Sequence, residues 1–137
     1  MADAKRDLVR AWLTKAHRDL EAACSVTSRD PPLFDIGAFH CQQAAEKAVK
    51  AFLVFSDSPF PKTHDVGDLA ERAAQREVRF AAWVGRVAHL SDYAVGARYP
   101  DVTLEVTSAQ YAEAAAAAAA FCEFVVSVIP ADMHPAA

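Results

Sequence analysis

The chain has 137 residues and a formal net charge of −4, and 53% of its residues are apolar. This length corresponds to one domain, because domains typically contain roughly 100 to 200 residues, so we expect a single unit over residues 1–137. Of the 73 apolar residues 31 are Ala and two are Ile, which favours helices over an all-β fold. The large apolar fraction argues against a disordered chain. The negative charge argues against a protein that coats DNA.

Proline residues divide the chain into four blocks, because proline lacks an amide donor and clashes with the preceding turn of a helix. The blocks are residues 1–30, 33–58, 62–99 and 101–129. Each is long enough for a helix of about five turns, and the third is long enough for two. The sequence therefore predicts an all-α, up-and-down bundle of four to five helices.

The first two blocks each carry an apolar stripe at spacings of three and four residues, which is typical of amphipathic helices. The stripe of the first block consists of Leu8, Val9, Trp12, Leu13, Ala16, Leu20 and Ala23. The stripe of the second block consists of Cys41, Ala45, Ala48, Val49, Phe52 and Phe55. Beside this second stripe lie His40, Gln43, Lys47 and Lys50. We therefore expect the second helix to have a partly basic flank.

The third block predicts a short helix that begins near Thr63 or Asp65, where acidic residues favour the first turns. A second helix is expected from about Arg79 to Tyr93. The last block opens with a capping box at Thr107, which has Gln110 three residues later, and its helix should continue to Pro130.

Four arginines accompany Trp83 in the third block, namely Arg72, Arg76, Arg79 and Arg86. They would line one flank if the helix were continuous, and arginine with an aromatic ring can bind single-stranded nucleic acid. Glu71 and Glu77 interleave with them, so a solvated face is the favoured interpretation.

Seven consecutive alanines, residues 114–120, make the last helix apolar on almost every side. Such a helix either lies at the centre of the bundle or makes a close contact with a second subunit. Only about 42 apolar residues other than Ala are left for the core of five helices, which is a modest number. We therefore predict a thin bundle that buries one face against a second copy, and hence a homodimer.

The most apolar window, residues 112–129, contains Glu113 and Glu123 and is mostly Ala, which is too weak for a membrane span. The first residues lack the features of a secretory signal. We expect a cytoplasmic protein that does not contact the membrane.

The cysteines Cys24, Cys41 and Cys122 form no CxxC pair. They are predicted to be small buried apolar residues in a reducing compartment. The four glycines are isolated, so no phosphate-binding loop is present. No metal and no cofactor is expected.

Residues 39–51 read Phe-His-Cys-Gln-Gln-Ala-Ala-Glu-Lys-Ala-Val-Lys-Ala, and Thr63, His64 and Asp65 follow. This segment resembles the second helix and the next turn of the HEPN domain (higher eukaryotes and prokaryotes nucleotide-binding), in its small stand-alone prokaryotic form. The run from Arg98 through Tyr99 to Pro100 is similar to an element that precedes the last helix in that family. The resemblance covers residues 7–128.

The resemblance implies a helical bundle that commonly dimerises and often works beside a separately encoded nucleotidyltransferase-like protein. Binding of a nucleotide or of RNA through its phosphates is also expected, because Lys and Arg bind phosphate by charge-assisted hydrogen bonds. The candidate residues are His40, Gln43, Lys47, Lys50, His64, Arg98 and Tyr99. The competing interpretation is a purely structural interaction module, which is favoured if the basic flank is buried or is neutralised by Glu46 and its neighbours.

Some relatives are ribonuclease toxins of toxin–antitoxin pairs, with an Arg-x(4 to 6)-His motif at or near the last long helix. In this chain Arg98 has no His at that spacing, and the one formal match, Arg10 with His17, lies in the first helix, where it carries almost no weight. The sequence therefore favours a protein that is not an enzyme. The alternative is a metal-independent endoribonuclease toxin in which His40, His64 or Arg98 replaces the missing pair.

Overall fold

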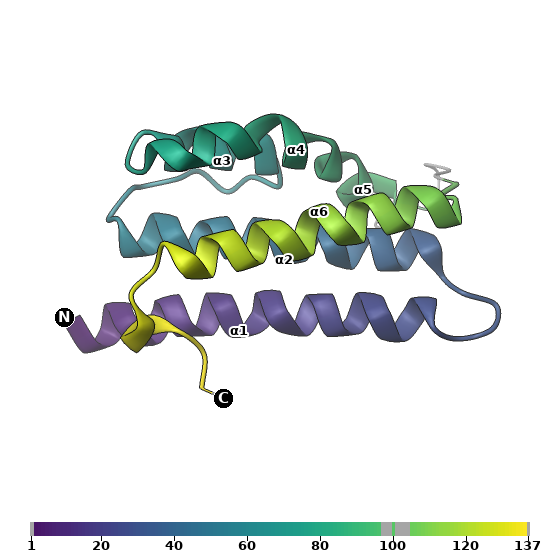
Figure 1. The fold of residues 1–137 in the computed structure, drawn as a ribbon, viewed down its shortest axis with the longest axis horizontal. Helices are drawn as coiled ribbons and strands as arrows, with labels where there is room; N and C mark the ends of the chain where they lie inside the picture. Colours follow the sequence, from purple (N-terminus) through teal and green to yellow (C-terminus); the bar gives the residue numbers. More distant parts are fainter. Residues whose placement is uncertain (1, 97–99, 101–104, 137) are drawn as a thin grey trace.

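The computed structural model describes residues 2–96, 100 and 105–136. These residues contain helices and turns but no strand, which confirms the all-α helical bundle. The long helices α1 (Ala2–Thr27) and α2 (Phe34–Phe55) lie side by side and run in opposite directions (Figure 1). The last long helix, α6 (Ser108–Ser127), packs along α2 and also contacts α1. The most buried helix is therefore α2, which packs against both other long helices.

The third block folds into a string of short helices. Its first helix, α3 (Val66–Ala74), begins where the sequence predicts, because the Asp65 side chain accepts a hydrogen bond from the amide of Asp68. The single helix expected from Arg79 to Tyr93 is not formed. In its place are η1 (Val78–Trp83), α4 (Val84–Ala88), η2 (His89–Ser91) and α5 (Asp92–Gly96).

The buried residues of this segment would also fit a continuous helix. The side chains that face the core here are Phe80, Trp83, Val84, Val87 and Leu90. At 100° per residue these positions fall within an arc of about 120°, which is typical of an amphipathic α-helix. The short 3₁₀ and α segments keep the same residues against the core, so the break in the helix does not follow from the apolar pattern.

Aromatic rings connect this segment to the long helices. The Phe80 ring is fully buried, and its centroid lies 4.6 Å from that of Phe52 on α2. It lies 6.0 Å from Phe121 and 4.9 Å from Phe124, both on α6. Phe80 thus joins three parts of the chain in one core.

The start of α6 has the predicted capping box: Thr107 accepts from the amide of Gln110, and Gln110 accepts from the amide of Thr107. Within the run of alanines, Ala114 and Ala118 are buried, while Ala116 and Ala119 are exposed. The interpretation that α6 lies at the centre of the bundle is therefore wrong. Close packing is found on its inner side, where the Cys122 thiol lies 3.7 Å from the carbonyl oxygen of Ala44.

Close packing also occurs where the end of α1, the start of α2 and the start of α6 converge. A Cβ atom placed on Gly37 would lie 2.5 Å from Cγ2 of Thr27 and 2.8 Å from Cε1 of Tyr111. Such distances are far below van der Waals contact, so any larger residue at this crossing would force Thr27 or Tyr111 to move.

Two expectations about individual side chains are corrected. Cys41 and Cys122 are buried as predicted, and burial raises the pKa of each thiol to about 12, which makes both unreactive. Cys24 is exposed, one position beyond the buried Ala23. Leu8 is 49% exposed, since its neighbour Val9 takes the core position and adjacent residues lie about 100° apart on a helix.

No helix in the part of the chain that the structure describes is long and apolar enough to span a membrane.

Candidate functional site

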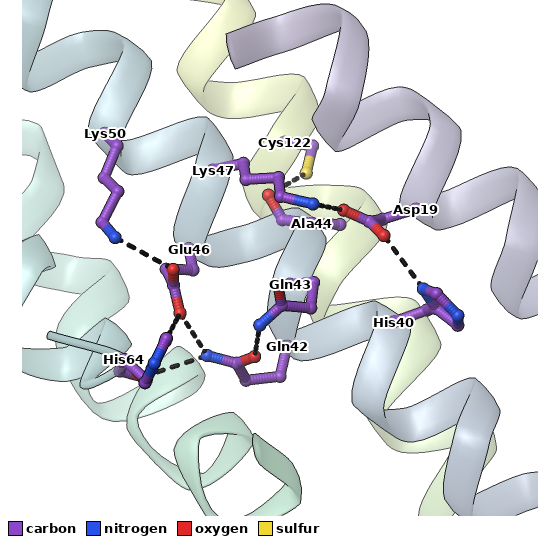
Figure 2. Close-up of polar contacts among 10 residues, drawn as sticks. All are labelled: Asp19, His40, Gln42, Gln43, Ala44, Glu46, Lys47, Lys50, His64 and Cys122. Atoms are coloured by element: carbon purple, nitrogen blue, oxygen red, sulfur yellow. Dashed lines mark hydrogen bonds and ion pairs between the residues drawn. The ribbon is translucent and has the colours of Figure 1, made fainter. Parts of the chain in front are cut away.

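The basic residues of the α2 flank, His40, Lys47 and Lys50, each contact one of two carboxylates (Figure 2). The first is Asp19, which reaches across from α1 and is 8% exposed. Its Oδ1 lies 2.9 Å from Nδ1 of His40, and its Oδ2 accepts from Nζ of Lys47 at 2.5 Å. We call Asp19, His40 and Lys47 the Asp19 triad. One carboxylate thus serves a lysine and a histidine from the neighbouring helix.

The second carboxylate is Glu46, which is 4% exposed and lies on α2 itself. It accepts hydrogen bonds from Nζ of Lys50 at 2.9 Å and from Nε2 of Gln42 at 2.9 Å. Its Oε1 is also 2.8 Å from Nδ1 of His64, in the loop before α3. The amide of Gln42 donates as well to the carbonyl oxygen of His64, and Gln43 donates to Gln42. These five residues form the Glu46 network.

The charge of Lys50 has further partners within the bundle. Although Lys50 is only 8% exposed, its ammonium group lies 5.7 Å from the ring centre of Trp12 and 5.8 Å from that of Phe60. Aromatic faces attract cations, so these rings and Glu46 together offset the cost of removing the ammonium from water.

The surroundings of Glu46 also set its acidity. Burial alone would raise the pKa of Glu46. The hydrogen bonds from Gln42, Lys50 and His64, with the positive charge of Lys50, outweigh burial and hold the pKa below the ordinary value of 4.5. The carboxylate is therefore ionised at neutral pH and can hold Lys50 as an ion pair.

Helix geometry explains why the flank divides into two sets. Residues 42, 46 and 50 are four apart and form one row on α2, which faces the loop that precedes α3. Residues 40 and 47 are seven apart and form a second row, which faces α1. The first row contains the carboxylate of Glu46, and the second row contacts the carboxylate of Asp19 on α1.

The structure places the predicted site residues as follows. Asp19 brings His40 and Lys47 together, and the Glu46 network brings Gln43, Lys50 and His64 together. Arg98 and Tyr99 lie outside the described residues.

Sequence reasoning did not assign a site role to Asp19 or Gln42. The signal for Asp19 was its position between Ala16 and Ala23, at the edge of the apolar stripe of α1, where a charge requires a partner.

The arginines of the third block do not form one basic row. Arg72 is bonded to Asp68 and Arg79 to Glu77, each within its own exposed turn, in accord with a solvated face. The guanidinium of Arg86 lies 4.0 Å from the ring centre of Trp83, and Phe124 stacks on the same indole at 5.3 Å. Trp83 is thus already packed against a cation and an aromatic ring of its own chain, in accord with a structural role.

The described residues also bear on metal binding and on the formal ribonuclease match. No group of three or more His, Cys, Asp or Glu side chains in that part of the chain could hold a metal ion. Arg10, of the formal ribonuclease match, donates to the carbonyl oxygen of Asp132 in the C-terminal segment.

Comparison with known proteins places these features in context. A family model described as the HEPN domain matches residues 9–129. Among solved structures, the crystal structure of ST0689, an archaeal HEPN homologue, is similar at a TM-score of 0.70 and 27% identity. The match covers 89% of this chain and 98% of that one. A search of curated proteins gives no match.

Proposed function

Because the chain belongs to the HEPN domain family, we propose that it is a cytoplasmic binding protein, not an enzyme, and that it acts as a homodimer which associates with a nucleotidyltransferase-like protein. One observation carries this proposal. The basic flank of α2, where a substrate phosphate was expected, is bonded to Asp19 and Glu46. In this proposal the flank stabilises the bundle, and the outer surfaces of the bundle bind other proteins.

The charges of the flank support this interpretation. Lys47 and Lys50 are each paired with one carboxylate, so the two lysines add no net positive charge to the flank. A phosphate would have to compete with Glu46 for an ammonium group that is almost fully buried. Removing the partner of a buried charge is costly, so Lys50 is held in place by the fold.

Co-expression with a nucleotidyltransferase-like protein from the same genome tests the proposal. We expect the two proteins to co-purify and to elute as one complex, whose mass by light scattering contains two copies of this chain. An unrelated helical bundle with the same tag is the control. A strict monomer that fails to bind this partner at tens of micromolar would contradict the proposal. Cleavage of tRNA or mRNA above a mock preparation would favour the endoribonuclease toxin instead.

We propose a second function, phosphate binding at the Asp19 triad, because two candidate side chains converge there on a single carboxylate. The side chains of His40 and Lys47 are 27% and 22% exposed, so solvent reaches both. Lys15, one turn before Asp19 on α1, is exposed and brings another positive charge to this surface. A nucleotide or RNA phosphate would meet these cations at the seam between α1 and α2.

Calorimetric titration with ATP and with pyrophosphate tests the second function. Lys47→Met should weaken binding about tenfold or more, because it removes one charge-assisted hydrogen bond and leaves Asp19 to repel the anion. Arg29→Met removes an exposed cation beyond the end of α1 and should leave the affinity unchanged. Equal affinities of the wild type and Lys47→Met would exclude this site.

A further inference from the structure

One face of α6 is not covered by the described part of the chain. The inner face of this helix is buried, whereas its exposed residues include Ala112, Glu113, Ala116, Ala119, Glu123 and Ser127. A helix that is apolar on nearly every side is normally buried on every side. Here the face from Ala112 to Ser127 extends over about 22 Å at 1.5 Å per residue.

A shallow groove of about 350 Å³ borders this face. It is lined by Trp83, Ala120, Glu123, Phe124 and Ser127. The guanidinium of Arg86, which is itself exposed, lies over the ring of Trp83. The uncovered face of α6 therefore has an aromatic groove and a positive charge along one edge.

We propose that a second copy of this chain binds at this surface, with the two α6 helices packed in antiparallel directions about a two-fold axis near Ala116. This proposal rests on the homodimer of the proposed function and identifies the surface that forms it. A two-fold interface must be complementary to itself. The small alanine side chains allow the two helices to approach closely, and the aromatic edge of each copy adds apolar area.

The charges select the antiparallel arrangement. The charged residues on the exposed face of α6 are Glu113 and Glu123. If the helices ran parallel, Glu113 would oppose Glu113 of the partner subunit, and Glu123 would oppose its own copy. Antiparallel packing about Ala116 instead places Glu113 of the partner subunit opposite Ala119, beside the groove that Trp83 lines and next to the Arg86 that covers this indole. The symmetry then forms two Arg86–Glu113 ion pairs.

A charge exchange tests this surface, with the dimer dissociation constant measured by sedimentation and light scattering. Glu113→Arg and Arg86→Glu should each raise the dissociation constant about tenfold or more, because each places two like charges at both symmetry-related contacts. The double variant Glu113→Arg/Arg86→Glu should restore it to within about threefold. Ala116→Trp should also give a monomer, because the indole obstructs the contact between the helices. Glu21→Arg, on the exposed side of α1, is the matched control and should leave the dimer unchanged.

The outcomes separate this surface from the proposed function. A wild type that remains monomeric at all concentrations overturns both the surface and the homodimer. A dimer that is insensitive to Glu113→Arg, Arg86→Glu and Ala116→Trp overturns the surface only. The surface is also overturned if these variants abolish binding of the nucleotidyltransferase-like protein but leave the dimer intact, since the groove would then belong to that partner. Circular dichroism of each variant shows that the monomer still folds.

Discussion

Replacing Glu46 by Leu is expected to lower the free energy of unfolding by about 3–5 kcal/mol. The glutamate is 4% exposed and accepts hydrogen bonds from Lys50 and Gln42. Without it, the Lys50 ammonium is left almost fully buried without its carboxylate, and Gln42 loses one acceptor. The imidazole of His64 loses its contact with Glu46 as well, which weakens the attachment of the loop that precedes α3. Urea denaturation followed by circular dichroism measures the change.

Two further variants show whether the unpaired charge is the cause. The double variant Glu46→Leu/Lys50→Met should recover most of the loss, because a buried ion pair can often be replaced by apolar side chains at little net cost. Glu71→Leu, on an exposed position of α3, should change stability by less than about 0.5 kcal/mol. A loss of the same size in Glu46→Leu and in the double variant would show that packing, not charge, dominates at this site.

The acidity of Glu46 makes the same contribution dependent on pH. Its pKa is held below the ordinary value of 4.5 in the folded chain, so folding is favoured by the ionised form. The stabilisation is fully present above the pKa of the unfolded chain and is lost as the pH falls through the lower pKa of the folded chain. Between pH 7 and about pH 3, the wild type should therefore lose more stability than Glu46→Gln, which cannot titrate.

The contrast between the two carboxylates shows what a sequence pattern can reveal about this site. Glu46 lies four residues from both Gln42 and Lys50, so its role as a neutralising group follows from helix periodicity within one segment. Asp19 lies 21 residues from His40 and 28 residues from Lys47, in another helix. Its partners depend on how α1 and α2 rotate against each other, which the periodicity of α2 does not specify.

The helices also differ in how far the sequence predicts them. The long helices α1 and α2 have apolar stripes with a clear period, so their existence and their buried sides were predictable. The run of alanines in α6 has no polar side, so the spacing of its apolar residues does not indicate which side of the helix is buried. The larger residues Phe121 and Val125, which are fully buried, orient that helix instead. In the segment 78–96 the buried positions fit a continuous α-helix as well as the short 3₁₀ and α turns that form, so the apolar pattern could not reveal the break.

Phe80→Ala tests whether that irregular segment depends on its one large buried ring. We expect a loss of about 3–5 kcal/mol in the free energy of unfolding, because the change removes a fully buried ring and leaves a cavity. The rings of Phe52, Phe121 and Phe124 all lie within 6.0 Å of it, centroid to centroid, so the cavity opens between α2, α6 and η1. Urea denaturation measures the loss.

Amide hydrogen exchange locates the effect, because a segment held mainly by one side chain opens before the rest of the chain. Residues 78–91 should exchange much faster in Phe80→Ala, while the centre of α1 should change only as far as global stability falls. Val78→Ala is the matched control on the same 3₁₀ helix: its side chain is 76% exposed, and we expect a change below about 0.5 kcal/mol. Uniform acceleration along α1, α2 and residues 78–91 would instead mean that the segment unfolds only with the whole bundle. Phe80 would then contribute to global stability without acting as the local anchor of the short helices.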